Sequence, residues 1–320
     1  WKNLVSDLSM YRTAKKLLKL EEFDIIHAVE ETALIARRLG AKYNIPYIYD
    51  IDSTLPNRLL SPKSILGKVR PLYRKLEKRT VEDSAGVLAS CNYLEARATS
   101  YFPKKIVRRL EDTSLLDKDI TDEKRKTTRL KVQPDTNTFM YVGNLGEHQG
   151  MDLLLESFSL ACLDKNDRIR LVIIGGQPGT IRKYKRKAKK LGIPKGKVRF
   201  TGPKSVLDLA CYLEQADVLV SPRSAGDTPP LKIYSYLDAG KPILATRTPC
   251  HTQVLHDDIA CLVEPKDSDL SLAIENLARD PELREELAVK ATRRAEKEYS
   301  REAFAQKLSV FYDKIAASLS

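Results

Sequence analysis

The chain has 320 residues, of which 42% are hydrophobic and 31% charged, and its formal net charge is +12 at pH 7. This balance excludes wholesale disorder, and no apolar run reaches the roughly 18 residues that a membrane-spanning helix needs. The first twenty residues lack the continuous apolar stretch and the small-residue cleavage site of a secretory signal. The length predicts about two domains.

Short β-rich apolar runs alternate with helical patterns along the chain. A helix opens it, and the expected strands are 24–29, 46–50, 85–89, 138–143, 169–174, 197–201, 217–221, 242–246 and 259–263. The expected helices between them are 30–43, 61–83, 91–101, 150–164, 179–191, 205–215 and 231–239. Helices also fill the last 55 residues, with Pro281 at a helix start and Ser300 as an N-cap. The alternation predicts an α/β fold with doubly wound parallel sheets.

A polar, poorly periodic segment, 111–134, separates the two halves. We therefore expect an N-terminal domain at 1–132, a C-terminal domain at 133–300 and a final helix within 301–320. The N-terminal half offers only three clear strands and begins with a helix, whereas a doubly wound domain normally begins with a strand. Our interpretation is that its first strands are trimmed from this sequence or supplied by another polypeptide.

The cysteines and histidines do not have the spacing of a metal site or a disulfide framework. Five cysteines lie far apart without a CxxC pair, and four histidines lack the HExxH spacing. We expect no metal and a reducing, cytoplasmic location.

Basic residues are concentrated in three runs, 68–79, 123–131 and 181–190. Such runs suit nucleic acid, anionic lipid or a phosphorylated small molecule, and each run is also compatible with a solvated helix face. We expect the helix at 68–79 to face an anionic membrane surface or a lipid-linked acceptor on the cytoplasmic side. Nucleic acid is disfavoured because no aromatic platform or base-reading motif accompanies the charge.

Three expected strands of the C-terminal half end in glycine- or proline-rich loops, and ligands of parallel sheets bind at such ends. The loops are GNLGEHQG at 143–150, GGQPG at 175–179 and PRSAGDTPP at 222–230. A helix starting near Pro230, with Thr228 as its cap, would offer the N–H groups of Leu231 and Lys232 to a diphosphate. The alternative is a helix packed on the sheet without a ligand.

The order and spacing of these motifs resemble family 4 glycosyltransferases of the GT-B fold. The resemblance covers nearly all of 138–300, from TFMYVGNLGEHQG through LVIIGG and KVRFTG to PPLKIYSYLDAGKPILAT and ACLVEP. It is looser over DIIHAVEETALIARRLGAKYNIPYIYDIDSTLP, which is similar to the acceptor-domain stretch of that family. It implies two Rossmann-like domains facing a cleft, the second binding a nucleotide-sugar, and a last helix that crosses back to the first. It further implies sugar transfer with retention and without an essential metal.

Several positions depart from the family pattern. The Arg and Lys that usually contact the donor diphosphate are matched by Asn144 and Gln149, which carry no charge. The two family glutamates fall on Asp227, facing the donor sugar, and Ser235, at the ribose. The acceptor-domain histidine falls on Asp52, whereas His27 and Glu30 match the upstream motif.

The resemblance and the residues together give the expected site. We expect Asp227, Asp52 and His27, placed at a strand end, to be catalytic. The expected donor-binding residues are Gly143, Asn144, Gln149, Gly202, Arg223, Thr228, Pro230, Leu231, Lys232 and Ser235. His148 is a candidate to replace part of the missing positive charge. Lys204 is a candidate to lie near the nucleobase of the donor.

We expect a retaining glycosyltransferase that uses a UDP-, GDP- or ADP-sugar. The alternative is a degenerate GT-B scaffold or regulatory subunit that binds nucleotide weakly or binds only a protein partner.

Overall fold

The computed structural model describes residues 2–55, 70–117, 119–130, 136–163 and 168–319. The chain forms two compact units, Trp1–Glu111 with Ala305–Ser320, and Asp112–Phe304. The boundaries therefore differ from the expected division near residue 132 and the expected start of the last segment at residue 301.

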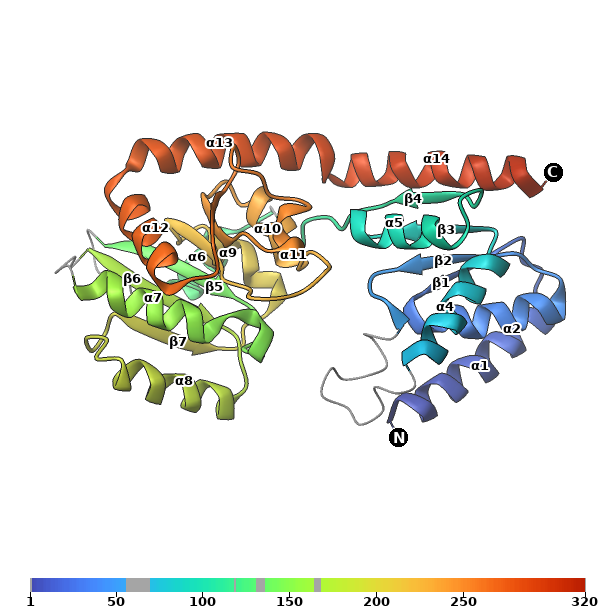
Figure 1. Cartoon of the computed structure of the whole chain (residues 1–320), viewed down its shortest axis with the longest axis horizontal. Helices are drawn as coiled ribbons and strands as arrows, with labels where there is room; N and C mark the ends of the chain where they lie inside the picture. The colour runs from blue at the N-terminus through green and yellow to red at the C-terminus, as the bar shows by residue number, and fades with distance from the viewer. Residues whose placement is uncertain (1, 56–69, 118, 131–135, 164–167, 320) are drawn as a thin grey trace. The chain divides into compact units, whose positions relative to one another are not determined.

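The first unit has a four-stranded parallel sheet with the order β1-β2-β3-β4 (Figure 1). Its elements are α1 (Lys2–Leu20), β1 (Ile26–Val29), η1 (Glu30–Thr32), α2 (Ala33–Tyr43), β2 (Tyr47–Ile51), α4 (Arg70–Asp83), β3 (Gly86–Ala89), α5 (Asn92–Tyr101) and β4 (Val107–Arg109). The sequence did not predict β4, because this strand has three residues and only Val107 is buried. The part of the expected helix at 61–69 lies outside the described residues.

The second unit has a six-stranded parallel sheet with the order β10-β9-β8-β5-β6-β7. Its first elements are α6 (Asp122–Thr127), β5 (Asn137–Val142), η3 (Glu147–Gln149), α7 (Met151–Leu163), β6 (Ile169–Ile174), α8 (Pro178–Lys190), β7 (Val198–Gly202), η4 (Val206–Asp208) and α9 (Leu209–Leu213). It continues with β8 (Val218–Ser221), α10 (Lys232–Asp238), β9 (Ile243–Thr246), α11 (Pro249–Thr252), β10 (Cys261–Val263), α12 (Asp267–Arg279) and α13 (Pro281–Glu298).

Burial on both faces explains why the central strands of this sheet read as continuous apolar runs. All four residues of β8 and of β9 are buried. One core, which includes Leu155 and Ile274, packs beneath α7, α8 and α12, and the other, which includes Tyr234 and Ala291, packs beneath α9, α10 and α13. The predicted doubly wound arrangement is confirmed, since parallel sheets need helices on both faces.

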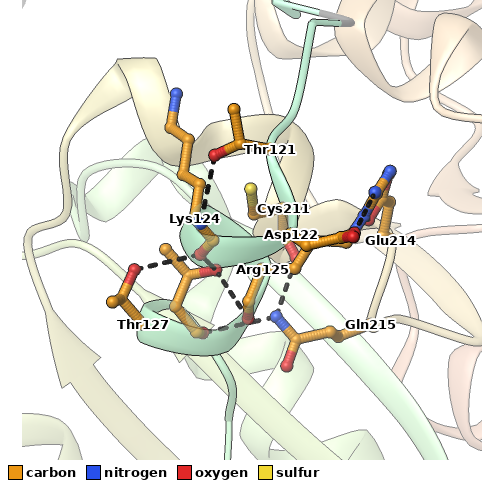
Figure 2. Close-up of polar contacts among 9 residues, drawn as sticks. Thr121, Asp122, Lys124, Arg125, Thr127, Cys211, Glu214 and Gln215 are labelled. Carbon is orange, nitrogen blue, oxygen red and sulfur yellow. Dashed lines mark hydrogen bonds and ion pairs between the residues drawn. The ribbon is translucent and has the colours of Figure 1, made fainter.

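The described part of the polar segment 111–134, which was expected to separate the two halves, folds largely onto the second unit. Thr121 caps α6, and Arg125 donates through Nε and Nη2 to the two carboxylate oxygens of Glu214, at 3.1 and 3.2 Å (Figure 2). Gln215 accepts from the Leu130 amide at 2.7 Å and donates to the Cys211 carbonyl at 2.7 Å. These contacts explain why the compact unit begins at Asp112 instead of after the segment.

The last helix, α14 (Arg301–Leu319), begins after Ser300, whose Oγ accepts from the Ala303 amide as expected of an N-cap. From Ala305 onward it belongs to the first unit, where Phe311 and Ile315 are buried. A Cβ on Gly86 would lie 2.5 Å from the Ile315 side chain, so glycine at the start of β3 permits this close approach.

Candidate donor site

The order of the six-stranded sheet reverses between β5 and β8. The chain runs outward from β5 through β6 to β7 and then returns to the other side of β5 with β8. In open parallel sheets, ligands bind beyond the carboxyl ends of the strands at such a switch point. The loops that leave there are 143–150 and 222–231, so the topology brings together two of the three loops expected from the sequence.

Glycines allow these two loops to touch through their backbones. Gly150 has φ +71°, and a Cβ there would lie 1.7 Å from the Pro222 carbonyl oxygen. The first loop also contacts the third loop, 175–179: Gly143 has φ +148°, and a Cβ on Gly175 would lie 2.1 Å from the Gly143 carbonyl oxygen. Only glycine fits such contacts and backbone angles without displacing the loops.

Lys232 points from the start of α10 toward the first loop. Its Nζ lies 3.9 Å from the centre of the Tyr141 ring and donates to Gln149 Oε1 at 3.4 Å. Burial, and secondly the charge of Arg223, lower the pKa of Lys232 to about 7. The aromatic face and the amide oxygen partly offset the desolvation of the ammonium group, and an anion would do so more strongly.

Arg223 follows β8 and supplies a permanent positive charge. Its Nη1 donates to the Thr228 carbonyl at 3.3 Å, and its own carbonyl accepts from Thr246 Oγ1 at 2.5 Å. Its Nε is buried without a hydrogen-bond partner among the described atoms. The guanidinium is therefore positioned by its own loop, and its hydrogen-bonding capacity is incompletely used.

The surroundings of His148 disfavour the positive charge that the sequence suggested for it. Burial, Arg223 and Lys232 lower its pKa below 6.5. Its Nε2 lies 3.0 Å from Gln149 Nε2, and because the amide nitrogen is a donor, the imidazole nitrogen must accept. Both the lowered pKa and this hydrogen bond favour the neutral form of His148.

The helix start differs from the expected one. Helix α10 begins at Lys232, its N-cap is Leu231, and no side chain caps it. Thr228 and Pro230 therefore occupy neither the cap nor the first helical position: Thr228 accepts from Arg223 through its carbonyl, and Pro230 accepts from the Ile233 amide. With seven residues the helix is short, so cationic side chains carry the attraction for anions here.

The remaining expected donor residues are distributed unevenly around the switch point. Asn144 is exposed and its Oδ1 accepts from the Gly146 amide, and Asp227 is also exposed. Ser235 is 0% exposed, and its Oγ accepts from the Leu115 amide at 3.1 Å, so this geometry leaves no accessible hydroxyl for a ribose. Gly202 ends β7, two strands away from β5, and its carbonyl accepts from the Gly175 amide.

Lys204, the residue expected near the nucleobase, follows Gly202 by two positions. Its Nζ lies 5.9 Å from the centre of the Tyr212 ring. Since β7 is two strands from β5, neither Gly202 nor Lys204 joins the group around Lys232.

A buried histidine that the sequence did not single out supports the second loop. His251, which is 0% exposed, donates from Nδ1 to the Thr246 carbonyl at 2.7 Å, and its Nε2 accepts from Ser221 Oγ at 2.9 Å. Because Thr246 in turn bonds the Arg223 carbonyl, the imidazole joins the ends of β8 and β9 to the loop that carries Arg223. Burial lowers its pKa from 6.5 to about 4.

The pKa of His251 predicts an acid-sensitive fold. The neutral form is favoured in the native state, so its stabilisation is present above pH 6.5 and is lost as the pH falls toward 4. Over that window we expect the native chain to lose about 3 kcal/mol more unfolding free energy than His251→Asn, which keeps a donor but does not titrate. Urea denaturation of both proteins at several pH values measures this difference. The same change of unfolding free energy with pH in both proteins would contradict the prediction.

In the first unit, the polar residues near the strand ends divide into two groups. His27 is the second residue of β1 and not its end, which corrects the expected strand-end position. Its ring lies 2.6 Å from Tyr312 Oη on α14 and 3.2 Å from Asp50 Oδ2 on β2, so it fastens α14 to the sheet.

The second group is at the carboxyl ends of β1 and β2, which are paired in parallel. Glu30 has φ +56° and accepts from Ser53 Oγ at 3.0 Å, and Asp52 is exposed beside Ser53. A non-glycine residue in the left-handed region is uncommon and often marks a functional loop. Glu30 and Asp52 therefore follow the carboxyl ends of neighbouring strands, whereas His27 lies within β1.

Glu77 was also missed by the sequence reading, because it lies in the middle of a basic run. Its side chain is 2% exposed and accepts from the Leu55 amide at 2.7 Å, from Arg97 Nε at 2.6 Å and from Tyr101 Oη at 2.8 Å. It thereby fixes the backbone three residues after Asp52.

Comparison with solved structures identifies the fold. HepE from Anabaena, crystallised with UDP, has a TM-score of 0.78 at 12% identity, over 96% of this chain and 82% of that one. Sucrose-phosphate synthase from Thermosynechococcus elongatus has a TM-score of 0.77 at 18% identity, over 97% and 78%. A UDP-forming trehalose-phosphate synthase from Burkholderia xenovorans has a TM-score of 0.72 at 14% identity, over 98% and 79%. No curated protein sequence matches the chain.

The two parallel α/β units thus have the GT-B fold, and the predicted fold class is confirmed. The chain belongs to the glycosyl transferases group 1 family, whose model matches residues 122–294; the glycosyl transferase 4-like domain matches residues 1–109. Within the described residues, no group of three or more His, Cys, Asp or Glu side chains could hold a metal ion, and no helix is long and apolar enough to cross a bilayer.

Proposed function

We propose that the protein transfers a sugar from a nucleotide-sugar to an acceptor hydroxyl with retention, and that Lys232 and Arg223 bind the donor diphosphate. The observation that carries the proposal is the position of these two cations at the switch point of the family-matched unit. A diphosphate bound between the loops would offset both the desolvation of the Lys232 ammonium and its repulsion by Arg223, which together lower its pKa.

The chemistry assigned to this site is stabilisation of the leaving group. As the bond between the sugar and the diphosphate breaks, negative charge grows on the diphosphate oxygens, and preorganised cations lower the energy of that state. Asp227, exposed on the same loop as Arg223, is the candidate that faces the sugar. We assign Asp52 and Glu30, which belong to the first unit, to binding of the acceptor.

The donor class is supported by a structural neighbour, since HepE was crystallised with UDP and also with UDP-glucose. The preference for one nucleobase is tested by titrating the purified chain with UDP-, GDP- and ADP-glucose in a calorimeter. Assays for sugar release follow. We expect one of the three to bind and to be hydrolysed slowly without an acceptor. If none binds at millimolar concentration, the proposal fails.

One observation favours a second candidate, a non-catalytic scaffold of the same fold. Ser235 is buried against Leu115, and both Asn144 and Gln149 lack the charge that usually assists phosphate binding. A scaffold of this kind would bind nucleotide weakly without releasing sugar, or would bind only a protein partner, so the same titration and assay separate the two functions.

A further inference from the structure

Helix α8 carries an unusual excess of positive charge. Its sequence, PGTIRKYKRKAKK, has seven basic residues and no acidic one. Its inner side packs in the core through Tyr184 and Ala188, beside α7 and β7 (Figure 1). Only one of its cations is neutralised at that side: Lys187 donates to Asp152 and Glu156, at 2.6 Å each.

The other six cations lie on the outer face of α8. All are exposed: Arg182, Lys183, Lys185, Arg186, Lys189 and Lys190. At 3.6 residues per turn they cover a continuous arc of roughly 160°, along a helix about 20 Å long. None has an ion pair with any described residue.

This charge distribution needs an explanation beyond solubility. Cations four residues apart on a helix repel one another, and Arg182 with Arg186, Lys185 with Lys189 and Arg186 with Lys190 have this spacing. The helix dipole favours only those in the last turn. Another exposed helix of this unit, α13, intersperses its cations with glutamates, for example Lys290 with Glu286 at four residues.

We propose that the outer face of α8 docks the protein on an anionic lipid bilayer through electrostatic attraction. Clusters of four to eight Lys and Arg on one helix face are typical of attraction to acidic lipid headgroups. Four of the six residues are lysines, which act as flexible point charges and suit a diffuse array of headgroups.

The same face lacks what nucleic-acid binding would require. Single strands are held by exposed aromatic rings, but the one aromatic residue of α8, Tyr184, is buried and bonded to Asp152. Because all six cations are on a convex helix surface, they match a plane better than a groove. This surface differs from the basic run at 68–79, whose described part is in α4 of the other unit.

Vesicle sedimentation with the full chain tests the proposal. The probes are phosphatidylglycerol-containing vesicles and pure phosphatidylcholine vesicles, at about 0.1 M and again at higher salt. We expect binding to the anionic vesicles only, weakened by salt. Each cation removed should lower the partition coefficient about fivefold, so the triple variant Arg182→Glu, Arg186→Glu, Lys189→Glu should lose binding altogether.

The matched control reverses three exposed cations elsewhere on the same unit, Lys266→Glu, Arg293→Glu and Lys297→Glu. It has the same net charge as the α8 variant and should retain most of the binding. Equal losses in both variants, or no binding of the parent chain to anionic vesicles, would overturn the proposal. So would tighter binding to a single-stranded or duplex oligonucleotide that depends on the same three residues.

Discussion

Replacing Lys232 by methionine is expected to weaken nucleotide-sugar binding about 100-fold, the effect of losing a charge-assisted hydrogen bond to a diphosphate. Methionine keeps the length and packing of the side chain over the Tyr141 ring, so the fold should persist. Calorimetric titration with the preferred nucleotide-sugar measures the loss. Lys266→Met, an exposed position before α12, is the control and should bind as the parent does.

The pH dependence of the same binding reports the charge on Lys232 directly. With a pKa of about 7, the free side chain is half neutral at neutral pH, whereas a bound diphosphate raises its pKa. Binding therefore takes up a proton, and the affinity should fall as the pH rises above 7, by up to tenfold per pH unit.

Lys232→Arg should remove this dependence because a guanidinium remains charged throughout. Affinity that is flat with pH in the parent, or equally steep in Lys232→Arg, would show that Lys232 does not contact the phosphate.

Patterns of local spacing predicted most of the fold. The buried strands of the second unit, such as 169–174 and 217–221, are continuous apolar runs, and their expected bounds agree with β6 and β8 within one residue. The three-residue β4 and helix α6 were missed, since a short strand and a polar six-residue helix have too little periodicity to be recognised. Helix α6 is held by contacts to Glu214 and Gln215, which are far away in sequence.

The candidate site was predictable where backbone topology determines it and not where side chains do. Strand order alone brings Gly143, Gln149, Arg223 and Lys232 to one edge. The burial of Ser235 depends on Leu115, which is 120 positions away. The lowered pKa of His148 comes from burial and from Arg223 and Lys232, which lie more than 70 positions further along the chain, and no local motif encodes these contacts.

Replacing Glu77 by alanine should destabilise the first unit by about 4 kcal/mol, because it leaves Arg97 as an unpaired, largely buried charge. The Leu55 amide and the Tyr101 hydroxyl lose their acceptor as well. Glu77→Gln keeps a neutral acceptor of the same shape and should cost less. Thermal unfolding measures both changes, with Glu82→Ala, an exposed position on the same helix, as the control.

Hydrogen exchange separates a local effect from a general one. The Leu55 amide should lose its protection in Glu77→Ala, while amides in β5 and β6 of the other unit keep theirs. Since Leu55 follows Asp52 by three residues, the freed loop should also raise the KM for the acceptor more than that for the donor. An unchanged Leu55 exchange rate would mean that Glu77 does not hold this loop.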